Sequence, residues 1–172
     1  LVGDLAQSTG AWARDSWDDV TEALQLRHPV AVVPLSLGYR VPQQVFAVAA
    51  QLLPHAAPGV EVPQVVRHGP SDPEYYQVES EDVGIEAVRA AGAYAARGLF
   101  VGVVCPDAFR AAVVRALEGA DIQYKDARSG SLGAGINLVS PTDAKGLEFD
   151  AVVVVEPEAI VSVAELARPA RQ

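Results

Sequence analysis

The chain has 172 residues, half of them hydrophobic, a length that suits one domain or one domain with part of a neighbour. Its net charge of −9 argues against a stand-alone DNA-binding module, although an acidic domain can touch DNA when a partner supplies the positive surface. No apolar run approaches the roughly 18 residues of a membrane span and no signal-peptide pattern occurs, so we expect a cytoplasmic protein that does not engage membranes.

The hydrophobic periodicity of the first half predicts helices, short strands and a loop. The helices cover residues 16–26 and 41–53, the strands residues 30–35, 64–67 and 75–78, and the Pro-, His- and Gly-rich loop residues 54–73. Ser16 can cap the first helix. The second helix carries apolar residues at 45, 48, 49, 52 and 53, the stripe of a helix that lies on a sheet.

The second half continues the alternation. Helices are expected over residues 82–97, from Asp107 onward and over 164–171, and strands over residues 99–104, 122–125, 136–140 and 151–155. Asp107 is expected to cap its helix. Strands separated by helices predict an α/β fold, with a parallel or mixed sheet sandwiched by helices. Cys105 is the single cysteine, which excludes an internal disulfide, and its apolar flanks favour the end of a buried strand over a nucleophile.

Three short segments carry residue types that suit nucleotide or nucleic-acid chemistry. The first runs Leu-Val-Gly-Asp-Leu-Ala-Gln-Ser from residue 1 to 8, with Trp12 following. The amide of Gln7 can donate to a phosphate oxygen and accept from water, and the face of Trp12 can stack on any base. A turn glutamine and a core tryptophan are the structural alternatives.

The second segment is Gly38-Tyr39-Arg40, just before the predicted helix 41–53. A planar, permanently charged guanidinium such as that of Arg40 can neutralise charge on a transferring phosphoryl group. The alternative is a surface arginine near a helix start, where the helix dipole is mildly unfavourable to a cation.

The third segment runs Ser-Pro-Thr-Asp-Ala-Lys-Gly-Leu-Glu-Phe-Asp from residue 140 to 150 and precedes an apolar strand. Gly146 would let the backbone approach a ligand closely. Lys145 either faces a phosphate or pairs with an acid. An ordinary charged turn between two strands is the alternative for the whole segment.

In this order the segments resemble motifs III, IV and V of UvrD-like superfamily 1 helicases, and the resemblance spans nearly the whole chain. It implies the second RecA-like (P-loop NTPase-like) motor lobe, a three-layer α/β domain with a mainly parallel sheet. Residues 1–12 would end the motif III strand and link from the first lobe, and residues 13–172 would form the second lobe, truncated before motif VI. No phosphate-binding loop of the form GxxxxGK[ST] occurs.

The resemblance also implies residue roles. Gln7 and Arg40 would sense and reach the γ-phosphate as catalytic residues, and Tyr39 would stack on adenine. Gly146, Lys145 and Glu148 would line the nucleotide site, with Glu148 accepting hydrogen bonds from the ribose. Trp12 and Thr142 would contact nucleic acid. We therefore expect Gln7, Arg40 and Glu148 to converge on one exposed edge of a sheet.

The implied cofactor is ATP with Mg²⁺, shared with the first lobe of the same chain, so this chain alone is expected to be inactive. The partner beyond that lobe would be single-stranded DNA. The alternative is a HelD-like ATPase that remodels bacterial RNA polymerase, and two features of the sequence indicate it. About 105 positions separate Arg40 from Lys145, too few for an inserted subdomain, and Ser140-Pro141-Thr142 replaces the family's common Thr-x-His.

An unrelated alternative is a Rossmann-like small-molecule enzyme. It would need a GxGxxG turn after a strand, whereas Gly133-Ala134-Gly135 precedes one. The three histidines share no ligand spacing, so we assign no metal to His28, His55 and His68.

Overall fold

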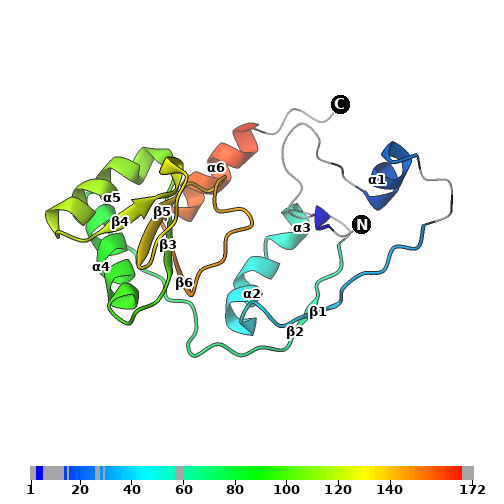
Figure 1. Ribbon diagram of the computed structural model, residues 1–172, viewed down its shortest axis with the longest axis horizontal. Helices are drawn as coiled ribbons and strands as arrows, with labels where there is room; N and C mark the ends of the chain where they lie inside the picture. The colour runs from blue at the N-terminus through cyan, green and yellow to red at the C-terminus, as the bar shows by residue number, and fades with distance from the viewer. Residues whose placement is uncertain are drawn as a thin grey trace. The chain divides into compact units, whose positions relative to one another are not determined.

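The computed structural model describes residues 3–5, 14, 16–25, 28, 30–56 and 60–167, the last five of them as backbone only. The chain forms two compact units, Leu1–Tyr75 and Tyr76–Gln172, here called unit 1 and unit 2. Figure 1 labels their helices and strands. None of the helices in the described part of the chain has the length and apolarity needed to span a bilayer.

Unit 2 is an α/β domain built on a four-stranded, all-parallel sheet. Its strands are β3 (Val101–Val104), β4 (Tyr124–Asp126), β5 (Ile136–Val139) and β6 (Ala151–Val154), in the spatial order β4-β5-β3-β6. Val101 pairs with both Ile136 and Ala151, so β5, β3 and β6 begin at the same level. The prediction of a mainly parallel sheet packed against helices is confirmed.

Two helices, α4 (Val83–Ala95) and α5 (Asp107–Gly119), pack side by side against one face of this sheet (Figure 1). The core between them and the strands is apolar, and its fully buried side chains include Val101, Val103, Val113, Leu117, Ile136 and Leu138. The sequence of α5 predicts an apolar stripe at residues 109, 112, 113, 116 and 117. This stripe is confirmed, because Val113 and Leu117 lie in the core and Phe109 and Ala116 pack against it. Burial of aliphatic side chains, each contributing about 1.5–3 kcal/mol, holds the layer together.

Glycine controls the approach of the two helices. A Cβ on Gly84 of α4 would lie 2.5 Å from the carbonyl oxygen of Ala112 in α5, so only glycine fits at this crossing. After α4, Gly98 adopts a left-handed conformation (φ 79°) and its N–H bonds to Ala95 O at 2.9 Å, which ends the helix as predicted.

The opposite face of the sheet is met by a loop. Successive residues of a strand point to opposite faces, so Gly102 faces away from the core that holds Val101 and Val103. Residues 140–150 join β5 to β6, and the ring of Phe149 from this loop lies against Gly102. Val152 and Val154 of β6 are half exposed. The expected sandwich requires helices on both faces of the sheet, whereas α4 and α5 cover only one face.

Several predicted boundaries in unit 2 were wrong for local reasons. Pro106, not Asp107, is the N-cap of α5, and Asp107 instead pairs with Arg128. The last helix, α6 (Pro157–Ala167), begins seven positions before the expected residue 164. Its start suits proline because the first helical N–H needs no partner inside the helix. Residues 75–78 form no strand, and Tyr75 and Tyr76 are exposed.

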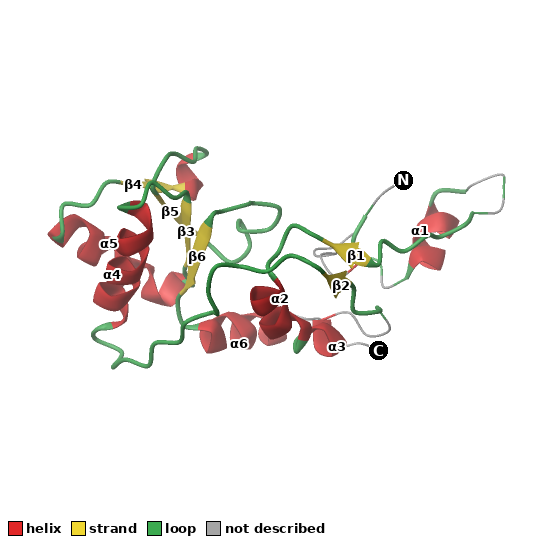
Figure 2. Cartoon of the chain, turned by 90° about the horizontal axis from the view of Figure 1, so that it is seen from below, coloured by secondary structure: helices red, strands yellow, loops and turns green. Residues whose placement is uncertain are grey.

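Unit 1 contains little regular structure in its described residues (Figure 2). Its helices are α1 (Trp17–Ala23), α2 (Gln43–Ala50) and α3 (Leu53–Ala56), and its strands β1 (Leu37–Gly38) and β2 (Gln64–Val65) form one parallel pair. The predicted cap of the first helix is confirmed, since Ser16 Oγ accepts a hydrogen bond from Asp19 N at 3.0 Å.

Two predictions in unit 1 were wrong. Residues 30–35 form no strand, and Val33 and Leu35 are 78% and 84% exposed. The predicted helix 41–53 is divided into α2 and α3, and none of the residues of α2 is buried. The physical reason is that a sheet of two strands with two residues each offers no broad apolar surface to receive the stripe.

Candidate functional site

The loop between β5 and β6 holds most of the predicted nucleotide-site residues. It begins at Ser140, which is buried directly after the carboxyl end of β5. Ser140 Oγ donates to Asp143 Oδ2 at 2.6 Å and accepts from Asp143 N at 3.1 Å, and Ala144 N donates to Ser140 O at 2.9 Å. This small turn fixes the start of the loop.

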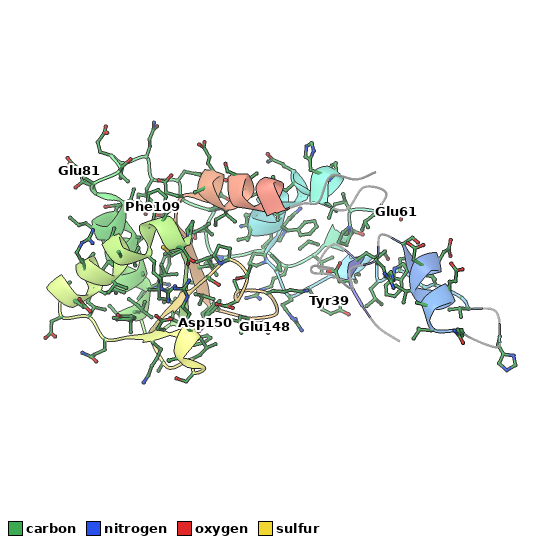
Figure 3. All side chains as sticks on the ribbon, turned by 90° about the horizontal axis from the view of Figure 1, so that it is seen from above. Tyr39, Glu61, Glu81, Phe109, Glu148 and Asp150 are labelled. Carbon is green, nitrogen blue, oxygen red and sulfur yellow. The ribbon has the colours of Figure 1, made fainter. Side chains whose placement is uncertain are left out.

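The middle of the loop presents its polar groups to solvent. Lys145, Gly146 and Glu148 are all exposed, and Gly146 has φ 78°, the left-handed conformation that favours glycine. Figure 3 labels Glu148 and Asp150 on this loop, just before β6. Lys145 precedes Gly146 and Glu148 follows it by two positions, so this stretch has a cation, an open backbone and a carboxylate that can contact phosphate and hydroxyl oxygens.

The loop runs from one end of the sheet to the other. Ser140 follows the carboxyl end of β5, whereas Asp150 precedes the amino end of β6. Ligands of open parallel sheets usually bind outside the carboxyl ends of the strands. Thr142 lies near that end, while Glu148 lies toward the amino ends, so the loop's predicted ligand groups are spread along its length.

Thr142 has a local partner. Its Oγ1 lies 2.9 Å from Ser140 Oγ, so the hydroxyl of Thr142 belongs to the turn that starts the loop. The side chain is nevertheless exposed. Its predicted contact with nucleic acid stays a prediction.

Tyr39 and Arg40 belong to unit 1, where they follow β1 and precede α2. Tyr39 is 70% exposed, and its position is labelled in Figure 3. Arg67 Nη1 donates to the backbone oxygen of Arg40 at 2.6 Å, and Gln43 N donates to Arg67 O at 2.7 Å. Arg67, which follows β2, therefore holds the segment between β1 and α2 through its guanidinium and its backbone carbonyl.

Sequence patterns missed a charged cluster in unit 2. Arg110 of α5 is only 9% exposed, and its Nη2 bonds to Asp126 at the end of β4. Its Nη1 is buried and has no hydrogen-bond partner among the described residues. Partial burial acts to raise the pKa of Asp126, but the bonds from Arg110 and from Arg128 N outweigh it and lower that pKa below its usual 3.8. Arg110 is not part of the apolar stripe predicted for this helix, but it precedes Val113 of that stripe by three positions, and this spacing was the available signal.

Cys105 lies fully buried beside this cluster, at the end of β3 as the sequence predicted. Burial raises the pKa of its thiol to about 11, a change that nearby Asp107 reinforces and Arg110 opposes. A thiol that is neutral and inaccessible at neutral pH is a poor nucleophile.

Two of the predicted site residues lie in a part of the chain that the structure does not describe. Gln7 and Trp12 lie outside the described residues, so their predicted roles stay predictions, as does the convergence of Gln7, Arg40 and Glu148. In the described ranges no group of three or more His, Cys, Asp and Glu side chains could hold a metal ion.

Comparison with models of known protein families finds no match to this chain, and no curated protein sequence matches it. The class that the fold defines is thus an α/β domain with a four-stranded parallel sheet.

Proposed function

We propose that the chain is the second motor lobe of a cytoplasmic, ATP-driven helicase or translocase of the UvrD-like type. The proposal rests above all on the segment Ala-Lys-Gly-Leu-Glu-Phe-Asp, which leads directly into a strand of a parallel sheet. Its lysine, glycine and glutamate are exposed, and its glycine has no side chain that would keep a ligand away from the backbone.

In this proposal each exposed group has one task. The carboxylate of Glu148 accepts hydrogen bonds from a ribose hydroxyl, Lys145 attracts phosphate, and Gly146 lets the backbone come near. Tyr39 offers an aromatic face to adenine. Arg40 neutralises charge that develops on the transferring phosphoryl group, a role worth about 10³–10⁵ in rate.

The lobe cannot complete the reaction by itself. The sequence carries no GxxxxGK[ST] loop, so a first lobe with such a loop must bind the phosphates of ATP. Mg²⁺ bound with ATP would neutralise phosphate charge on that side. Closing and reopening of the two lobes would then couple hydrolysis to movement along single-stranded DNA.

Nucleotide contact is testable on the 172-residue chain. Titration of the ¹⁵N-labelled chain with ATP to millimolar concentration should shift the amide resonances of Gly146 and Glu148. Glu148→Gln should weaken the response several-fold, whereas Glu81→Gln, which changes another exposed carboxylate, should not. Absence of any shift in residues 144–148 would remove the basis of the proposal.

Hydrolysis requires the first lobe. Mixing that lobe, made separately, with this chain should yield ATPase activity, and Arg40→Ala should lower the rate by about 10³-fold or more. Arg115→Ala, which removes an exposed arginine of α5, is the matched control. Equal rates for Arg40→Ala and the unsubstituted chain would take Arg40 out of its proposed role.

A second candidate is a HelD-like ATPase that remodels RNA polymerase. Two observations favour it: the net charge of −9 disfavours DNA, and the hydroxyl of Thr142 lies within hydrogen-bond distance of Ser140. Binding of the chain to single-stranded DNA at low salt, measured beside binding to bacterial RNA polymerase, separates the candidates. Retention by the polymerase without DNA binding would favour the second.

A further inference from the structure

The end of the β5–β6 loop is held against the sheet by two neighbouring residues, Phe149 and Asp150. Phe149 packs on Phe100, with ring centroids 5.0 Å apart and planes 28° apart. The same ring occupies the space beside Gly102, where an added Cβ would lie 2.6–2.8 Å from three ring carbons. The absence of a side chain at residue 102 is therefore what lets the ring reach the backbone of β3.

Asp150 fastens the loop to the residue before β3. Its Oδ2 accepts a hydrogen bond from Phe100 N at 2.9 Å, and its own N–H donates to Phe100 O at 2.8 Å. Side chain and backbone of Asp150 thus satisfy both backbone groups of Phe100. The packing of the Phe149 ring on Gly102 and the two hydrogen bonds between Asp150 and Phe100 together form what we call the Phe149–Asp150 clamp.

The clamp lies immediately beside the exposed groups of the loop. Glu148 directly precedes Phe149, and Leu147 N donates to Ala144 O at 3.1 Å, which closes a turn around Lys145 and Gly146. With the start of the loop fixed by Ser140 and its end by the clamp, the turn between them has little freedom to rotate. Fixing both ends lowers the entropy lost when a ligand binds.

We propose that Phe149 and Asp150 are positioning residues that hold Lys145, Gly146 and Glu148 in the arrangement that contacts the nucleotide. This inference rests on the proposed function. It assigns a role to two residues that reach no nucleotide themselves, and it makes Gly102 of β3 a requirement of the site.

The first arm of the test compares two substitutions of Asp150 in the 172-residue chain. Asp150→Ala removes the acceptor for Phe100 N, whereas Asp150→Asn keeps an acceptor oxygen. Hydrogen exchange at Leu147 N should quicken about tenfold in Asp150→Ala, the equivalent of one lost hydrogen bond, and stay within about twofold in Asp150→Asn. Glu118→Ala, on the exposed face of α5, is the control and should leave the exchange rate at Leu147 N unchanged.

The second arm uses the contact between Phe149 and Gly102. Gly102→Ala should displace the ring and weaken the ATP-induced shift of Gly146 by several-fold. Phe149→Leu in the Gly102→Ala background makes room for the new methyl group and should restore part of the response. Amide exchange in α4 and α5 should be unchanged in each variant, which separates positioning from loss of the fold.

The outcomes distinguish this inference from the function on which it rests. Failure of the unsubstituted chain to respond to ATP would overturn the proposed function and the positioning role together. A normal ATP response in the unsubstituted chain, matched by equal affinity in Asp150→Ala and Gly102→Ala, would overturn the positioning role alone. Weaker binding in both variants, with recovery in Asp150→Asn, is the expected result.

Discussion

Gly84 of α4 lies against the backbone of Ala112 in α5, so closely that a Cβ on residue 84 would be 2.5 Å from the Ala112 carbonyl oxygen and 2.6 Å from its carbon. Backbone cannot move aside as a flexible side chain can. The contact sets how closely the two helices pack, and with them the apolar layer that covers one face of the sheet.

This contact predicts opposite effects for two glycines of the same helix. Gly84→Ala should lower the free energy of unfolding by about 1–3 kcal/mol, because α5 must shift to admit the methyl group. Gly92→Ala should raise it by about 0.5–1 kcal/mol, because its Cβ would meet only Ile122 Cδ1, at 3.8 Å. Urea denaturation of both variants measures the difference. A Gly84→Ala chain as stable as the Gly92→Ala chain would contradict the observed helix contact.

The ion pair between Arg110 and Asp126 predicts a second effect on stability. Asp126→Asn should cost about 1–3 kcal/mol, because a guanidinium that is nearly buried would lose its carboxylate partner. Asp107→Asn is the control: its pair with Arg128 is largely exposed, so the cost should stay below about 1 kcal/mol. Chemical denaturation at neutral pH gives both values, and equal losses would argue against a special role for burial.

The same pair predicts a dependence on acid. The pKa of Asp126 is lowered in the folded chain from its usual 3.8, so folding favours the ionised carboxylate. The resulting stabilisation is fully present above the unfolded value and is lost as the pH falls through the lower folded value. The difference in unfolding free energy between the unsubstituted chain and Asp126→Asn should therefore shrink below about pH 4. A gap that persists in strong acid would contradict this assignment.

Cys105 predicts the opposite direction of pH dependence. Burial raises the pKa of its thiol from 9.0 to about 11, so the thiolate forms first in the unfolded chain. The stability that the neutral thiol contributes is fully present below pH 9.0 and is lost as the pH rises to about 11. Comparison with Cys105→Ala isolates this contribution, about 3 kcal/mol, from other groups that titrate there.

Reaction of Cys105 with a thiol reagent gives an independent check. Modification at neutral pH should be slow in the folded chain and should accelerate with denaturant in step with unfolding, since the side chain is fully buried. Rapid labelling of the folded chain would show that the strand end is accessible.

The contact between α2 and the segment that follows β2 in unit 1 leads to a further prediction. The amide of Gln44 bonds to both backbone groups of Gly69, donating to its oxygen at 3.2 Å and accepting from its N–H at 2.9 Å. Gln44→Ala should speed hydrogen exchange at Gly69 N by about tenfold. Gln43→Ala, next to it in α2 and exposed, should have no such effect. Unchanged exchange in Gln44→Ala would mean that Gly69 is held by other groups.

Much of unit 2 was predictable from its sequence because its signals are local. The apolar run before Cys105 marks a strand covered on both faces, and the stripe of α5 marks the face that packs on the sheet, as Val113 and Leu117 confirm. The polar loop before β6 was also predicted, since Lys145, Gly146 and Glu148 are adjacent in the chain and need no long-range contact to be brought together.

Tertiary structure alone decided the order β4-β5-β3-β6, because strand order depends on which apolar faces can be buried together and not on any single segment. It also decided that Phe149 packs beside Gly102 and that Arg110 meets Asp126, contacts that join residues 47 and 16 positions apart. Conversely, residues 30–35 have the composition of a buried strand but are exposed, because a strand needs a neighbour to satisfy its backbone. Composition and periodicity determine which segments can form helices and strands, whereas partners distant in the sequence determine which of them do.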